Sequence, residues 1–71
     1  MVSTEEERVR GAAMRWYVAY QETLRIRIET DPHIDESKAA WDLFVLLAEE
    51  ITDLAIRRQF AWLFAHEGRE D

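Results

Sequence analysis

A single proline, Pro32, is the strongest constraint on how this chain of 71 residues can fold. The residue before a proline is held out of the helical region, so we expect an element to end at Asp31–Pro32. Only two glycines accompany this proline, and neither residue type occurs between Pro32 and His66. The sequence therefore predicts a few long elements with one turn between them.

Apolar side chains before the proline recur every three or four residues, which is typical of an amphipathic helix. They are Val9, Ala13, Trp16, Tyr17, Tyr20, Leu24 and Ile28. Ser3 or Thr4, followed by three glutamates, favours a helix start near Thr4. We expect this helix to run to about Glu29, a length of about 39 Å. Residues 24–29 also alternate apolar and polar side chains like a half-buried strand, and this alternative stays open.

The segment around the proline has the composition of a helix start. Asp31 is the expected N-cap, Pro32 the first helical residue, and Asp35 and Glu36 the acidic first turn. A second helix should therefore begin between Pro32 and Ser37.

This second helical region is either one helix of about 32 residues or two helices broken near Thr52, where Thr52 or Asp53 would cap the new start. Gly68 should end it. Projected as one helix, the region collects a main apolar face of Ala40, Leu43, Phe44, Leu47, Ile51, Leu54, Ala61, Trp62 and Ala65. A second apolar patch holds Val45, Leu46, Ile56, Phe60, Leu63 and Phe64. Burying both requires a break in the helix or another subunit.

These patterns predict an all-α fold, a helical hairpin or a three-helix bundle, formed by one domain over residues 1–71. The chain has no cysteine, which excludes disulfides and thiolate metal sites and leaves a small core to hold the fold. Oligomerisation is a common remedy for so small a core. We therefore expect self-association, most simply a twofold dimer.

The charge of the chain is unevenly distributed. Residues 1–30 hold five arginines and five glutamates, whereas residues 31–71 hold four basic and ten acidic residues, for a net charge of −6. This argues against direct binding to nucleic acid or to an anionic membrane. No apolar stretch approaches 18 residues and the first residues lack a signal-peptide pattern, so we expect a cytoplasmic protein.

No catalytic, cofactor or metal site is expected from the residue types. Nucleophilic catalysis needs a nucleophile beside a base, and the two serines lie at expected helix starts. His33 and His66 lack a glutamate three residues earlier, the spacing of helical carboxylate metal sites. We interpret His33 as a turn residue and His66 as a favourable charge at a helix C-terminus. A small enzyme or metal carrier assembled from several chains is the least favoured hypothesis.

The favoured hypothesis is a non-enzymatic interaction module, a homodimeric regulator, adaptor or assembly subunit. Aromatic side chains and arginine anchor interfaces. Arg58 falls between Leu54 and Trp62 on the main apolar face, where it would pair with a carboxylate such as Glu22 or stack on an aromatic ring. The candidate contact residues are Trp16, Tyr20, Trp41, Ile56, Arg58, Phe60, Trp62 and Phe64.

The alternative hypothesis is an acidic inhibitor that imitates nucleic-acid phosphates and blocks the basic groove of a nucleic-acid-handling protein. Its acidic face would be Asp42, Glu49, Glu50 and Asp53. Under this hypothesis the partner is a protein with a basic surface, and binding weakens steeply with salt.

Overall fold

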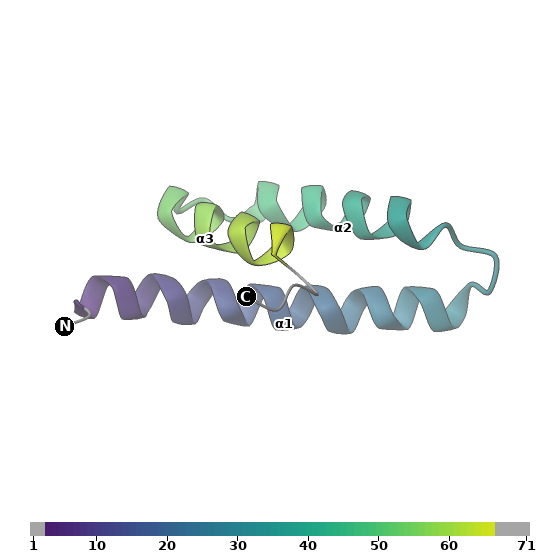
Figure 1. The fold of residues 1–71 in the computed structure, drawn as a ribbon, viewed down its shortest axis with the longest axis horizontal. Helices are drawn as coiled ribbons and strands as arrows, with labels where there is room; N and C mark the ends of the chain where they lie inside the picture. Colours follow the sequence, from purple (N-terminus) through teal and green to yellow (C-terminus); the bar gives the residue numbers. More distant parts are fainter. Residues whose placement is uncertain (1–2, 67–71) are drawn as a thin grey trace.

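Three helices make up most of residues 3–66, the part of the chain that the computed structural model describes. Helix α1 spans Thr4–Thr30, α2 spans Glu36–Glu50 and α3 spans Leu54–Ala65 (Figure 1). The described residues contain no strand. The all-α prediction is confirmed, and the helices pack as a three-helix bundle rather than as a hairpin of two helices. The predicted stop at Gly68 lies outside the described residues.

Helix α1 begins where the capping signal predicts. Ser3 is the N-cap, and its hydroxyl accepts a hydrogen bond from the backbone N–H of Glu6 at 3.1 Å. The helix continues without interruption for 27 residues, so the strand alternative for residues 24–29 is wrong. Helical periodicity across the whole segment outweighs six residues of local alternation, because no second strand is present among the described residues to pair with it.

The turn after α1 corrects the predicted capping of α2. Asp31 ends α1, since its backbone N–H still donates to the carbonyl of Arg27 at 3.1 Å. The N-cap of α2 is Asp35, whose carboxylate accepts from the N–H of Lys38 at 3.1 Å. The start at Glu36 falls inside the predicted interval, but Pro32 lies in the turn instead of the first helical position. His33 also lies in this turn, as expected.

A break at residues 51–53 separates α2 from α3 near the predicted position. Asp53 caps α3 by accepting from the N–H groups of Ala55 and Ile56, at 3.0 and 3.4 Å. Arg57 Nε donates to the carbonyl of Ile51 at 3.1 Å and so satisfies an acceptor at the end of α2. The capping therefore fixes a change of chain direction here.

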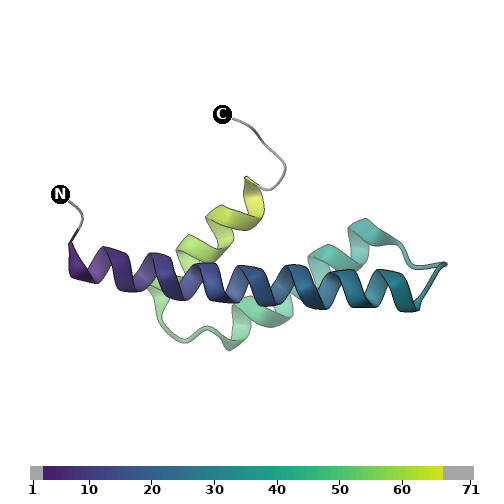
Figure 2. The same cartoon turned by 90° about the horizontal axis from the view of Figure 1, so that it is seen from below.

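The helices form two layers. Helix α1 is one layer, and α2 and α3 lie side by side in the other, with α3 over the N-terminal half of α1 and α2 over its C-terminal half (Figures 1 and 2). The Cα atoms extend 46 × 29 × 15 Å. The shortest extent corresponds to two helix layers, since packed helices lie about 8–10 Å apart and each Cα cylinder adds about 2.3 Å. Each helix therefore has an outer side that no other described helix covers.

Aromatic side chains join the two layers. Tyr20 and Phe60 are fully buried and meet edge to face, with ring centroids 6.2 Å apart. Phe44 stacks on Phe60 and on Phe64, at 5.3 and 4.2 Å. The Tyr20 hydroxyl donates to the carbonyl of Ala40 at 3.1 Å, which ties α1 to α2. The buried cluster consists of Ala13, Tyr17, Tyr20, Leu43, Ile51, Ile56 and Phe60.

The break reverses the expected roles of the two apolar faces of α3. On α2 the predicted main face does turn inward, with Leu43 buried. On α3 the predicted second patch turns inward instead, so that Ile56 and Phe60 are buried while Leu54 and Trp62 of the main face lie exposed. A projection as one continuous helix assumes that the helical rotation of α2 continues unchanged into α3. The three non-helical residues between them change that rotation, so the projection assigns the residues of α3 to the wrong faces.

Candidate functional site

The structure divides the eight predicted contact residues into core and surface. Tyr20, Ile56 and Phe60 are buried within the chain itself. Trp16 and Phe64 are partly buried against the same core. These five residues hold the three helices together, so we leave them out of the candidate site.

Trp41, Arg58 and Trp62 are the predicted contact residues that remain exposed. Trp41 is 57% exposed, yet its ring still lies against Phe44 and Phe64, at centroid distances of 5.6 and 6.0 Å. Trp62 is 53% exposed and lies on the outer side of α3. Trp62 therefore presents an aromatic surface that the described core does not use.

Leu54, Arg58 and Trp62 form a continuous row on the outer side of α3, which we call the α3 strip. They are four residues apart, so their side chains follow one another along one helix face. All three are exposed, Leu54 by 55%. A tryptophan beside an arginine is the composition of an interface anchor, and Leu54 adds exposed apolar surface next to them.

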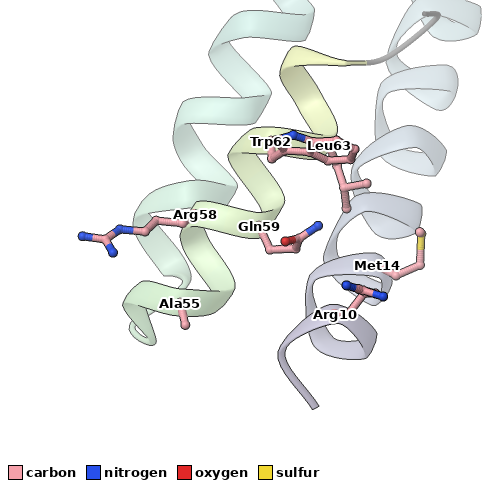
Figure 3. A pocket seen from close by; sticks show the side chains of 7 residues that line it. All are labelled: Arg10, Met14, Ala55, Arg58, Gln59, Trp62 and Leu63. Atoms are coloured by element: carbon pink, nitrogen blue, oxygen red, sulfur yellow. The ribbon is translucent and has the colours of Figure 1, made fainter. Parts of the chain in front are cut away.

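A shallow groove of about 600 Å³ runs between the α3 strip and α1 (Figure 3). Its walls are Arg10, Met14, Ala55, Arg58, Gln59, Trp62 and Leu63. Figure 3 shows the Gln59 side chain directed toward α1, with Met14 on the facing helix, while the Arg58 side chain extends away from α1. The groove thus adds apolar surface from α1 to one side of the α3 strip.

The end of α3 holds the Trp62 ring in place. The ring of His66 stacks on that of Trp62 at a centroid distance of 4.3 Å, and Nδ1 of His66 lies 2.8 Å from the Trp62 carbonyl oxygen. His66 is the C-cap of α3, consistent with its predicted place at a helix C-terminus. A side chain already restrained in this way loses less rotamer freedom when it is covered by a partner.

The predicted partnership of Arg58 with Glu22 does not form within the chain. Glu22 instead pairs with Arg25 at 2.6 Å. Within residues 3–66, Arg58 makes neither an ion pair nor a hydrogen bond. Its guanidinium is therefore unpaired within the described residues.

The predicted acidic face is reduced to three residues. Asp42, Glu49 and Glu50 are exposed on α2 and have no ion pair within residues 3–66. Asp53 differs, because its carboxylate caps α3 and lies 3.1 Å from the guanidinium of Arg8. The hydrogen bond from Arg8 lowers the pKa of Asp53 below its usual 3.8, and the N–H groups of α3 lower it further. Asp53 thus has a structural role of its own.

No reaction chemistry is evident in the described part of the chain. Residues 3–66 contain no group of three potential metal-ligating side chains, and none of their helices is long and apolar enough to cross a membrane. Asp35, beside the predicted turn histidine, is engaged as the N-cap of α2. What the arrangement offers is an apolar and cationic surface on α3 and an acidic surface on α2.

Three residues of these surfaces escaped the sequence analysis. Leu54 was assigned to a buried face, while Met14 and Leu46, 45% and 50% exposed, were not singled out as contacts. Met14 lies off the apolar stripe of α1, and an apolar residue off the stripe is a usable signal of an outward contact. Leu46 likewise lies off the main apolar face of α2. For Leu54 no local signal exists, because its exposure depends on the break after α2.

Fold and surface together define a small all-helical bundle with an exposed aromatic and cationic strip. No protein-family model, curated protein or solved structure matches this chain.

Proposed function

We propose that this chain is a non-enzymatic protein–protein interaction module that acts as a homodimer, as a small regulator, adaptor or assembly subunit of the cytoplasm. The observation that carries the proposal is the α3 strip, where Leu54 and Trp62 expose more than half of their surface on one helix face. Clustered apolar side chains of this kind on a small domain mark interaction sites.

The small core of the monomer supports self-association with a second copy of the chain. Within residues 3–66, seven large apolar side chains are exposed: Met14, Val18, Ile26, Trp41, Leu46, Leu54 and Trp62. Only three side chains, Tyr20, Phe60 and Leu43, are both large and fully buried. A domain that buries so little gains stability by covering its outer faces, and a second copy is always available to cover them.

Light scattering behind size exclusion tests this proposal, at two protein concentrations and at low and high salt. We expect the mass of a dimer at the higher concentration at both salt levels, because apolar contacts are screened little by ions. Leu54→Ala and Trp62→Ala should each weaken the dimer by about tenfold or more, as truncated anchors do. Ile26→Ala is the matched control, since Ile26 is similarly exposed at the far end of α1. A monomeric mass under every condition would overturn the proposal.

The acidic inhibitor remains as a second candidate because Asp42, Glu49 and Glu50 are exposed and unpaired within the described residues. It predicts a monomer in the same experiment. Binding to a basic protein would then fall steeply with salt and would be lost in the variant Glu49→Lys/Glu50→Lys.

A further inference from the structure

We infer that the α3 strip is covered by the outer face of α2 from a second copy of the chain, in a twofold dimer with two equivalent contacts. The inference rests on the homodimer proposed above and adds which two surfaces meet. Its central contact sets Arg58 of each chain against the carboxylates beside Leu46 of the other.

The charge of α3 points to an acidic partner surface. Residues 54–65 include Arg57 and Arg58 and no acidic residue. Arg57 Nε donates to the carbonyl of Ile51, whereas Arg58 has no partner within residues 3–66. An arginine between two apolar side chains is satisfied by a carboxylate, which its planar guanidinium binds with two parallel hydrogen bonds.

The outer face of α2 has the complementary pattern. Asp42, Leu46 and Glu49 are spaced by four and three residues, so they lie on one side of the helix. Leu46 is 50% exposed, and neither carboxylate forms an ion pair within the described residues. A leucine flanked by carboxylates on α2 thus matches an arginine flanked by apolar side chains on α3.

The arrangement of the two layers permits both contacts at once. Helices α2 and α3 lie side by side in one layer against α1 (Figures 1 and 2), and Asp42 lies at the edge of α2, where it lines a shallow hollow together with Lys38 and with Arg27 of α1. A twofold axis in the plane of the interface, between α2 and α3, places α3 of each copy over α2 of the other. Such an isologous contact closes as a dimer and does not propagate.

A second copy is favoured over an unrelated acidic peptide because residues 31–71, with ten acidic and four basic residues, contain both the arginines of α3 and the carboxylates of α2. The chain therefore carries both halves of the contact. Two copies of the chain therefore present complementary surfaces to each other.

Charge reversal tests the pairing of the two surfaces. Arg58→Glu alone, and Asp42→Arg/Glu49→Arg alone, should each weaken self-association by about tenfold or more, because like charges then face each other in both contacts. An equimolar mixture of the two variants should recover a dimer, since both contacts of the mixed pair join opposite charges. Light scattering measures the mass, and circular dichroism checks that every variant is as helical as the parent.

Arg15→Glu is the matched control. It makes the same change in net charge as Arg58→Glu, and Arg15 is exposed on α1 and does not line the groove beside the α3 strip. We expect its dimer to be unchanged.

The outcomes separate this inference from the function on which it rests. If Trp62→Ala abolishes the dimer but Arg58→Glu does not affect it, the contact between α3 and α2 of the other copy is wrong. The proposal of a homodimer would still hold. Failure of the mixed variants to dimerise would likewise exclude this pairing. A parent chain that is monomeric throughout would remove both.

Discussion

Asp53 stabilises two separate features through one carboxylate. One oxygen accepts from the N–H groups that begin α3, and the other accepts from Arg8 on α1, at 3.1 Å. Arg8 in turn pairs with Glu5 at 2.7 Å. The break in the chain and the placement of α3 over α1 thus share one ionised side chain.

This carboxylate should make the fold sensitive to acid. The folded pKa of Asp53 lies below its usual 3.8, chiefly because of the hydrogen bond from Arg8. Its contribution is therefore present above pH about 4 and is lost as the pH falls through the folded pKa. We expect Asp53→Asn, which keeps a good N-cap, to lose less stability than the parent between about pH 7 and about pH 3. Urea unfolding at the two pH values measures the difference.

The control for this prediction is Glu50→Gln, which removes an exposed carboxylate that has no hydrogen bond in the described residues and lies outside the proposed dimer contact. It should keep the acid sensitivity of the parent. Equal acid sensitivity of Asp53→Asn and the parent would show that the Arg8 contact does not stabilise the fold.

At the level of the helices, capping sets the boundaries more than intrinsic propensity does. Ser3, Asp35 and Asp53 each accept from the N–H groups of the helix that follows. Helix α1 continues through Gly11 although glycine is a poor helix former. Packing of the apolar stripe of α1 on α2 and α3 stabilises the helix and offsets the unfavourable helix propensity of Gly11.

Gly11 therefore offers a stabilising substitution. A Cβ atom placed there would meet only the flexible end of Arg15, at an ordinary contact distance of 3.8 Å. We expect Gly11→Ala to stabilise the fold by about 0.5–1 kcal/mol, because alanine loses less backbone entropy on forming a helix. Thermal and urea unfolding followed by circular dichroism will measure it. A destabilised variant would indicate a close neighbour at Gly11 that the single chain does not contain.

The molecule as a whole is only two helices thick, and this makes it depend on few core residues. Phe60 contacts both Tyr20 of α1 and Phe44 of α2, so one side chain connects all three helices. Trp62, two residues later, faces outward. Neighbouring aromatics on α3 thus differ completely in their contribution to the fold.

Substitution at these two positions should separate stability from association. Phe60→Ala should cost about 3–5 kcal/mol, as much as the entire stability expected of so small a core, and leave the chain largely unfolded. Trp62→Ala should retain its helical circular dichroism at a dilution where the parent is monomeric. If both variants unfold alike, the outward position of Trp62 is wrong.

Much of the secondary structure was predictable because its signals are local. The apolar repeat of α1, the effect of Pro32 and the capping residue Asp53 each act within a turn or two of helix. The prediction failed where two local signals competed: Asp31 and Asp35 are both capping residues, and the remaining hydrogen bond of Asp31 to α1 decided between them.

The candidate site was less predictable than the fold. Arg58 and Trp62 were expected at a contact surface and are exposed, but Tyr20, Ile56 and Phe60 of the same expected set form the core. Aromatic and aliphatic side chains suit an interior and an interface equally well, so residue type alone does not separate the two.

Helix content, the proline turn, the position of the break and the acidic charge of the second half all follow from the order of the residues. Which face of α3 is buried does not. Three non-helical residues reset the rotation of α3 relative to α2, and packing on Tyr20 of α1 then selects Ile56 and Phe60 for the core. That choice turns Leu54, Arg58 and Trp62 outward, because a helix that buries one side must expose the other.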